Sequence, residues 1–380
     1  MRHYDAIVAG VGGHGSAIAY HLAKSGTKTL ALERFELNHG NGSSHGETRG
    51  MRTAYYEHPG YLPLIDRALE LWDDLQKMTD KPIIRMTGGV AIGSEEGALV
   101  RGQIDAAKKH RFPHEVLGPK EANERFPCFH LSDQETCFYT PGSGILWSEN
   151  CIATHVKLAR EEGAQMHFNE PLVRWTQQKD KILVRTSMGE YTTDKLVLSS
   201  GAWLPRLVAE LGLPLKVERQ VLFWFRPLRE KANFGPGRMP AFNWQDPEGR
   251  IFYGVADVGT GVKVARHHGG KITTPGRVGR KLTKKDAAQP SALVKTGFPQ
   301  LDPEPVGGRV CLYTNAPDNQ FVIDFYPGNE NVIIASPCSG HGFKFASVVG
   351  EVVTELATRG RSSFDLDFVS IARFKKPGAK

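Results

Sequence analysis

Residues 4–15 of the chain read YDAIVAGVGGHG, an apolar run that leads directly into a G-x-G-x-x-G loop. Residues 16–25 follow with the apolar spacing of a helix, and residues 27–32 form a second apolar run that ends on Glu33. Two short apolar runs on either side of a helical segment are typical of parallel strands joined by a crossover helix. The stretch therefore predicts a βαβ unit at the start of the chain.

The glycines and the acidic residue of this unit occur where a dinucleotide needs them. Gly10 permits the tight turn, Gly12 lets backbone N–H groups approach a pyrophosphate, and Gly15 lets the helix pack closely on the strand. The helix N-terminus carries partial positive charge towards the phosphates, and Glu33 accepts hydrogen bonds from a ribose diol. The loop alone is a weak signal, but the ordered set of strand, loop, helix, strand and terminal acid predicts dinucleotide binding.

Composition limits the kinds of partner that the chain can have. The chain has 380 residues, of which 40% are hydrophobic and 23% charged, and its formal net charge is +7. No apolar run approaches the roughly 18 residues that a membrane span needs, so we expect no membrane association. The basic residues form no stripe with interleaved aromatics, which argues against nucleic-acid binding. A mild positive field suits a small anionic substrate better.

The cysteines indicate the cellular compartment. There are five, without a C-x-x-C pair or a metal-ligand spacing, so we predict no metal site. A scattered odd set is typical of reduced thiols in an intracellular protein. The N-terminal apolar run is short and already belongs to the first predicted strand, so we expect no signal peptide and a cytoplasmic location. The five are Cys128, Cys137, Cys151, Cys311 and Cys338.

The order of the predicted elements indicates two domains. Strand and helix patterns alternate near both ends and in the middle of the chain, whereas residues 220–225 and 249–265 resemble antiparallel, aromatic-rich strands. The sequence thus predicts an α/β fold in which a Rossmann-like domain, built from discontinuous segments, binds the dinucleotide. An α+β substrate domain with an antiparallel sheet is inserted between those segments. The dinucleotide-binding domain is assigned to residues 1–84, 149–217 and 320–380, and the substrate domain to residues 85–148 and 218–319.

Four segments together resemble a known family. They are the glycine loop with Glu33, residues 42–52 (GSSHGETRGMR), residues 261–267 (GVKVARH), and residues 310–314 (VCLYT) taken with residues 339–344 (SGHGFK). Their order and spacing, over essentially the whole chain, are similar to those of the monomeric sarcosine oxidase and N-methyltryptophan oxidase family, in the D-amino-acid-oxidase superfamily of flavoproteins. The resemblance implies a covalently held FAD and oxidation of the C–N bond of secondary amines and amino acids, with electrons passed to O₂.

The resemblance implies roles for several residues around the FAD ring. Cys311 resembles the cysteine that forms a thioether with the flavin 8-methyl group, and His45 and Arg49 resemble the pair that supports this attachment. Lys263 resembles the lysine that acts near flavin N5, where a cation stabilises the superoxide that forms when O₂ reacts. The other residues that the resemblance places at the cofactor are Ser43, Thr48, Gly340, Gly342 and Lys344.

The resemblance implies a second group of residues at the substrate. Arg52 and Lys344 resemble the pair that binds the substrate carboxylate, the arginine through a bidentate fork and the lysine as a point charge. Tyr253, Tyr313 and His267 resemble side chains that line the cavity around the amine.

Two places depart from the family pattern and leave the identity of the amine open. Pro337 and Cys338 precede the SGHGFK segment, where the family usually has glycine and an aromatic residue, which changes the wall close to the flavin. Asn243 and Trp244 precede Tyr253, where sarcosine oxidases have smaller or apolar side chains. Trp244 either narrows the pocket or stacks on an aromatic substrate.

The predicted reaction follows from these residues. A hydride equivalent passes from the N-methyl or α carbon to FAD, the imine is hydrolysed, and O₂ reoxidises the flavin to give H₂O₂; sarcosine would yield glycine and formaldehyde. Because the amine binds with its lone pair free, we expect activity to rise with pH. The expected partners are a small secondary amino acid and O₂, and the protein is expected to be a monomer.

Other functions share part of this pattern. A glycated (fructosyl) amino acid oxidase has similar motifs, and a flavin dehydrogenase of the same fold would use another electron acceptor, although Lys263 argues against the latter. An NAD(P) dehydrogenase shares the glycine loop but has no use for Cys311. A cofactor-binding protein without catalysis would have little reason to keep cations in several motif segments.

Overall fold

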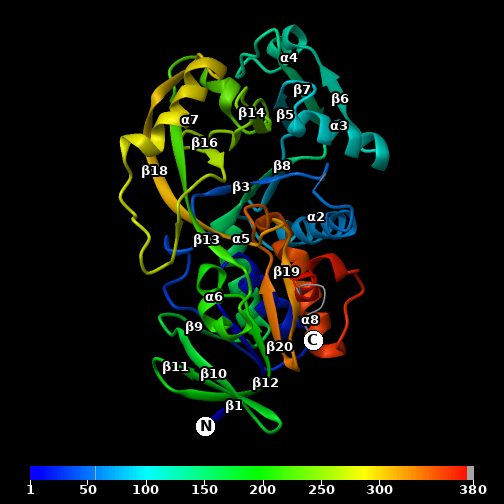
Figure 1. Cartoon of the computed structure of the whole chain (residues 1–380), viewed down its shortest axis with the longest axis vertical. Helices are drawn as coiled ribbons and strands as arrows, with labels where there is room; N and C mark the ends of the chain where they lie inside the picture. The colour runs from blue at the N-terminus through cyan, green and yellow to red at the C-terminus, as the bar shows by residue number, and fades with distance from the viewer. Residues whose placement is uncertain (56, 375–380) are drawn as a thin grey trace.

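The computed structural model describes residues 1–55 and 57–374 of the chain. Figure 1 shows an eight-stranded sheet with its helices in the lower half and a nine-stranded sheet in the upper half. Five strands of the eight-stranded sheet, β20, β12, β1, β2 and β9, pair in parallel, which confirms the predicted α/β fold. Its strands are β1 (Arg2–Ala9), β2 (Thr29–Leu32), β9 (Gln165–His167), β10 (Leu172–Gln178), β11 (Lys181–Thr186), β12 (Glu190–Leu198), β19 (Val322–Tyr326) and β20 (Asn329–Ser336).

The helices of this lower half pack against one another through small residues. A Cβ atom on Gly350 of α8 would lie 2.8 Å from the carbonyl oxygen of Ala17, so the two helices cross at close range there. The first helix begins at Gly13, three residues before the start that its apolar spacing predicts, because the tight glycine turn already ends at Gly12. The helices are α1 (Gly13–Lys24), α2 (Tyr61–Lys77), α5 (Ser148–Glu161), α6 (Leu204–Leu207) and α8 (Ala346–Arg359).

The nine-stranded sheet is antiparallel except where β14 pairs in parallel with β5. The predicted strand region 249–265 is interrupted: it folds into β15 and β16, which pair with each other in the antiparallel sense. The strands are β5 (Gly89–Gly93), β6 (Glu115–Leu117), β7 (Thr136–Thr140), β13 (Lys216–Pro227), β14 (Ala241–Gln245), β15 (Ile251–Val255), β16 (Val262–His267), β17 (Ile272–Thr273) and β18 (Leu301–Asn315). Helices α3 (Ala98–His110), α4 (Pro119–Arg125) and α7 (Lys284–Gly297) accompany it (Figure 1).

A small third sheet lies between the two large ones (Figure 1). It consists of β3 (Thr48–Met51), β8 (Gly144–Trp147) and β4 (Ile84–Met86). We propose that the predicted domain division describes the folded chain. In support, every strand of the eight-stranded sheet lies within the dinucleotide-binding segments 1–84, 149–217 and 320–380. The strands of the nine-stranded sheet lie within 85–148 and 218–319, except for the first two residues of β13.

Trp244 has neither of the two roles considered for it from the sequence. Successive residues of β14 point to opposite faces of the sheet, and Trp244 lies with Phe242 on the face that packs into the hydrophobic core of the upper half. Its indole N–H donates to Glu135 Oε1 at 2.6 Å. The neighbouring Asn243 faces the other way, into the cavity described below.

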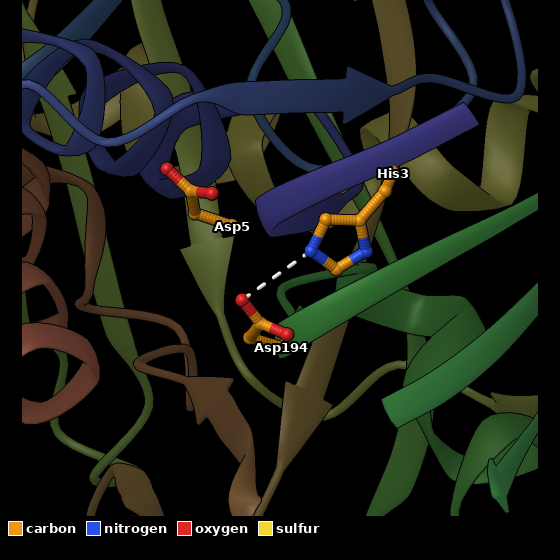
Figure 2. Close-up of side chains that lie close together, drawn as sticks. All are labelled: His3, Asp5 and Asp194. Atoms are coloured by element: carbon orange, nitrogen blue, oxygen red, sulfur yellow. Dashed lines mark ion pairs between the residues drawn. The ribbon is translucent and has the colours of Figure 1, made fainter. Parts of the chain in front are cut away.

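A group of polar side chains lies at the opposite end of the parallel strands from the glycine loop. Figure 2 shows His3 and Asp5 of β1 beside Asp194 of the neighbouring strand β12. His3 Nε2 lies 3.4 Å from Asp194 Oδ2, and Asp5 Oδ2 accepts from the backbone N–H of Lys28 at 2.9 Å. Because Gly10 follows the other end of β1, this group is remote from the candidate functional site.

Within residues 1–55 and 57–374, no helix combines the length and the apolar composition that crossing a membrane requires.

Candidate functional site

One elongated cavity of about 430 Å³ brings together the segments that the sequence singled out. It runs from the glycine loop past residues 42–52 to the face of the nine-stranded sheet and residues 337–344. Three predicted site residues do not line it: Gly15, Thr48 and Lys263. Those that do are Gly10, Gly12, Glu33, Ser43, His45, Arg49, Arg52, Tyr253, His267, Cys311, Tyr313, Gly340, Gly342 and Lys344.

The glycine loop shapes the nucleotide end of the cavity. Gly10 has φ +102°, and a Cβ atom on Gly15 would lie 1.7 Å from the Gly10 carbonyl oxygen, so the helix approaches the turn as closely as the sequence predicts. Gly12 has no side chain that could cap α1, although the Ser44 side chain accepts from one N–H of the first turn. The helix directs its positive end and the other N–H groups of this turn towards the cavity, which fits the phosphates of a dinucleotide.

Glu33 is held in place at the same end. Its Oε2 accepts from the Val11 backbone N–H at 2.8 Å, and its Oε1 accepts from the Phe35 N–H at 3.0 Å. His39 Nε2 lies 3.3 Å from Oε1. The carboxylate retains acceptor capacity for a ribose diol, since each of its oxygens has two lone pairs.

Sequence reasoning did not assign some of the residues around this end. The Gly13 N–H donates to Ser44 Oγ at 3.1 Å, and the Arg34 guanidinium lies 5.9 Å from the centre of the Trp203 ring. The turn at the end of β12 also reaches this end of the cavity, as its small residues indicate, because a strand that ends in small residues lets a ligand approach the backbone. Its cavity-lining residues are Ser199, Ser200, Gly201, Ala202 and Trp203.

His45, Arg49 and Cys311 form the middle of the cavity. Arg49 donates to the backbone oxygens of Thr48, Ser43 and His45 at 2.6–2.7 Å, so the guanidinium organises its own loop. Ser43 Oγ donates to the Leu312 carbonyl next to Cys311, which joins this loop to β18. Burial raises the pKa of the Cys311 thiol, against the lowering influence of the Arg49 and Lys263 cations.

The His45 ring is suited to a bound polar group. Neither of its nitrogens has a hydrogen-bond partner among the residues that the structure describes, although the side chain is buried. Burial and then the nearby Arg49 cation lower the pKa of His45 to about 4, so the ring is neutral at pH 7. Burying an imidazole without a hydrogen-bond partner costs free energy unless a ligand supplies that partner. The edge of a flavin offers both hydrogen-bond donors and acceptors. The residues present therefore fit an FAD.

Lys263 lies behind the cavity wall. Its Nζ donates to the backbone oxygens of Gly46 at 2.7 Å and Thr48 at 2.5 Å. Glu149 Oε1 accepts from the N–H groups of Gly46 and Glu47, so the same loop is pinned from its other side. Burial, then the Arg49 cation, hold the pKa of Lys263 well below its ordinary value. Its role towards O₂ stays a prediction.

Two cations meet at the far end of the cavity. The Arg52 guanidinium lies 4.5 Å and Lys344 Nζ 5.1 Å from the centre of the same Tyr55 ring. Arg52 also forms an ion pair with Glu57, which sequence reasoning missed. Lys344 belongs to the 3₁₀ turn Phe343–Phe345, which precedes the last helix. Burial and then the Arg52 cation lower the pKa of Lys344 to about 7.

Gln103 is a further contact of Arg52 that no sequence motif marks. It is buried on α3. In the amide orientation that satisfies its neighbours, Nε2 donates to the Ala54 carbonyl oxygen at 2.9 Å and Oε1 accepts from Arg52 Nη1 at 3.0 Å. Helix α3 of the proposed substrate domain therefore helps to orient the guanidinium.

The cavity wall between the glycine loop and the Arg52–Lys344 pair carries Tyr253, His267 and Tyr313. His267 Nδ1 is 3.4 Å from the Tyr313 hydroxyl, and the rings of Tyr253 and His267 meet edge to face with centroids 6.1 Å apart. A Cβ atom on Gly340 would lie 2.7 Å from Tyr313 and 2.9 Å from His267, so this close approach requires glycine. Burial holds the pKa of His267 well below its usual range, and the ring is neutral at pH 7.

Known proteins match the chain over most of its length. The sequence pattern of the family described as "FAD dependent oxidoreductase" matches residues 5–356. The chain is 38% identical to monomeric sarcosine oxidase of Streptomyces avermitilis over 95% of each chain. It is 32% identical to N-methyl-L-tryptophan oxidase of Salmonella agona, over 98% of this chain and 100% of the relative.

The fold is shared with solved structures. The structure of the Tyr258Phe mutant of NikD, described as an unusual amino acid oxidase essential for nikkomycin biosynthesis, matches with a TM-score of 0.87 over 97% of each chain. Its sequence identity to this chain is 22%, so this likeness concerns the fold alone.

Proposed function

The chain belongs to the family of FAD-dependent oxidoreductases, and from that premise we propose that it oxidises the C–N bond of a secondary amino acid. The names of its relatives, which specify sarcosine and N-methyl-L-tryptophan, support an N-methyl or cyclic amine as the substrate. When bound, FAD would supply the acceptor for the hydride equivalent and the route for electrons to O₂, with H₂O₂ as the product. One observation carries the proposal: a cation pair and a polar wall suited to flavin line the same cavity.

The chain's residues would hold the FAD along the cavity. Glu33 would accept from the ribose hydroxyls, and the N-terminus of α1 would face the pyrophosphate. His45 and Arg49 would lie against the flavin ring, and Cys311 would carry it through a thioether. The remaining proposed contacts with the cofactor come from Ser43, Thr48, Gly340, Gly342 and Lys344. Thr48 would act indirectly, because its backbone oxygen accepts a hydrogen bond from Lys263.

Arg52 and Lys344 would hold the substrate carboxylate. Arginine presents two parallel N–H donors to a carboxylate, and a buried lysine adds a point charge. Tyr253, His267 and Tyr313 would enclose the amine, and the neutral His267 avoids repulsion of a cationic substrate. The amine must lose its proton before it can give up a hydride, so turnover should rise with pH until the substrate is deprotonated.

The proposed function is tested by titrating the purified holoenzyme with amines in the absence of O₂ and then admitting air. The panel holds sarcosine, N-methyltryptophan, L-proline, L-pipecolate and a fructosyl amino acid. Bleaching of the flavin by a secondary amino acid, with fast recovery in air, is the expected result. Three outcomes would overturn the proposal. Bleaching by the fructosyl compound alone would indicate a glycated amino acid oxidase, and bleaching without recovery in air would indicate a dehydrogenase. The third is that no compound bleaches the flavin.

The lowered pKa of Lys344 leads to a prediction for carboxylate binding. Lys344 is protonated below pH 7, so a monocarboxylate such as propionate should bind tightly there and progressively more weakly as the pH rises through 7. The expected loss of affinity is about tenfold per pH unit until the pKa of the occupied site is reached. Glu57 and His341 do not titrate in this range, because their pKa values are lowered, that of His341 to about 3. The measurement is perturbation of the flavin spectrum between pH 6 and pH 9.

Two variants test whether Lys344 is the titrating group. Lys344→Met should bind propionate weakly at every pH. Arg52→Gln should move the loss of affinity to higher pH, since the Arg52 cation is one cause of the lowered Lys344 pKa. An affinity in the parent enzyme that does not change between pH 6 and pH 9 would contradict the assignment.

We further propose that the enzyme acts as a monomer in the cytoplasm. The word "monomeric" in the names of the sarcosine oxidase relatives supports the first part. The second part rests on the five cysteines, all of which are free thiols. Sedimentation of the holoenzyme tests the oligomeric state.

A further inference from the structure

We propose that Asn243 selects the substrate, and that the preferred secondary amino acid carries an amide or hydroxyl on its side chain. This inference rests on the proposed function, which places the carboxylate at Arg52 and Lys344 and the amine at the tyrosine and histidine wall. The third substituent of the α carbon must then face the rest of the cavity, where Asn243 lies.

The register of the nine-stranded sheet puts Asn243 in the middle of the cavity wall. Asn243 pairs with Tyr253 on β15 and with Ala91 on β5, and residues paired directly across strands share a face. Ala241, two residues earlier on the same face, pairs with Gly89. All five residues line the cavity. Ala91 and Ala241 present only methyl groups beside the Asn243 side chain, and the Ser143 side chain fills the space in front of Gly89.

The amide of Asn243 has unused hydrogen-bonding capacity. It makes no hydrogen bond with any residue in the ranges 1–55 and 57–374. An amide offers two donors and a carbonyl oxygen, and a substrate that closes the cavity removes the water that would otherwise satisfy them. A bound aliphatic side chain would leave these groups unpaired, whereas an amide or hydroxyl would pair with them.

A second polar group lies nearby. Ser143 lines the same cavity, and its buried Oγ has no hydrogen-bond partner among the described residues. A Cβ atom on Gly89 would lie 2.9 Å from this Oγ, which places the hydroxyl in front of Gly89. Two polar groups without partners on one wall favour a substrate with a matching polar side chain.

This wall adjoins the proposed carboxylate anchor. Ala91 packs in one cluster with Ala54 and Leu99. Arg52 lies two residues before Ala54 in the chain, and its Nη1 donates to the Ala54 carbonyl oxygen at 3.2 Å. The carboxylate anchor is therefore next to this cluster. A substrate held by its carboxylate at Arg52 can therefore extend its side chain towards Asn243.

An isosteric pair of substrates tests the inference in the holoenzyme. N-methyl-L-asparagine and N-methyl-L-leucine have side chains of similar size and branching but differ in polarity, and sarcosine, which has no side chain, serves as the reference. The parent should favour N-methyl-L-asparagine by about tenfold in kcat/KM, because a site built around a hydrogen bond rejects the analogue that lacks it. The isosteric variant Asn243→Leu should reverse this ratio.

Two further variants keep the test independent of folding. Ser143→Ala should reduce the preference for N-methyl-L-asparagine in the same direction but by less. Asn329→Leu makes the same substitution on β20, where Asn329 contacts Gln177, and should leave the ratio unchanged. Flavin absorbance and thermal unfolding establish that each variant is folded.

The outcomes separate this inference from the proposed function. If sarcosine bleaches the parent flavin but N-methyl-L-leucine is used as well as N-methyl-L-asparagine, the role of Asn243 is wrong and the proposed function stands. The role is also wrong if Asn243→Leu lowers kcat/KM equally for both compounds, or if it fails to fold and Ser143→Ala leaves the ratio unchanged. If no secondary amino acid bleaches the flavin, the proposed function itself fails.

Discussion

Replacing Lys263 with methionine is expected to slow reoxidation of the reduced flavin by O₂ by about two to three orders of magnitude. Superoxide forms when the first electron reaches O₂, and a fixed cation in a dry site stabilises that charge without reorganisation. Lys263 is 2% exposed, and its Nζ is held by the Gly46 and Thr48 carbonyl oxygens beside the segment that carries Arg49. Methionine keeps a similar volume but removes the charge.

The two half-reactions distinguish this role from a structural one. Stopped-flow absorbance should show that reduction by the amine changes by less than about tenfold, since Lys263 lies behind the cavity wall and away from the carboxylate anchor. Lys295→Met on the exposed face of α7 is the matched control and should change neither rate. Equal slowing of reduction and reoxidation in Lys263→Met would count against the assignment.

Replacing Cys311 with serine is expected to abolish covalent attachment of the flavin. Cys311 is a buried thiol on β18 that lines the cavity in the same region as His45 and Arg49. A serine hydroxyl is far less nucleophilic than a thiol whose proton can leave near two cations, so no thioether equivalent should form. Flavin fluorescence of the denatured protein on a gel measures attachment and should disappear completely.

The chain provides a matched control for this prediction. Cys338 also lines the cavity, and burial raises the pKa of both thiols, that of Cys338 to about 11, but only for Cys311 do the Arg49 and Lys263 cations oppose this rise. Cys338→Ser should therefore retain the fluorescent band. Persistence of the band in Cys311→Ser, or its loss in Cys338→Ser alone, would show that the flavin is attached elsewhere.

Local patterns predicted the elements whose residues interact with near neighbours along the chain. The βαβ unit is confirmed as β1, α1 and β2. The chain also alternates at residues 262–264, where Val262 and Val264 pack into the core of the upper half and Lys263 points to the opposite face. The same reasoning was incomplete at Asn243 and Trp244, since alternation separates two faces but does not say which face is covered by core and which by cavity.

Boundaries were less well predicted where a turn determines them. The helix after the glycine loop starts at Gly13 because the turn ends there, although glycines contribute no apolar periodicity. Lys344 lies in a separate 3₁₀ turn before α8, where it donates to the His341 carbonyl oxygen at 2.6 Å. That turn, and not the helix that follows, orients its ammonium group.

By itself the sequence determined the parallel βαβ unit and the family, and it predicted the dinucleotide-binding end, because each depends on short motifs whose order along the chain carries the information. Only the tertiary structure revealed that Gln103 orients Arg52, that Glu149 pins the loop beneath Lys263, and that Asn243 faces the cavity. These contacts join segments from different sheets and helices, and no local periodicity encodes them. They form when the two large sheets pack around one cavity, because long-range burial of apolar surface, and not local pattern, sets the distance between such side chains.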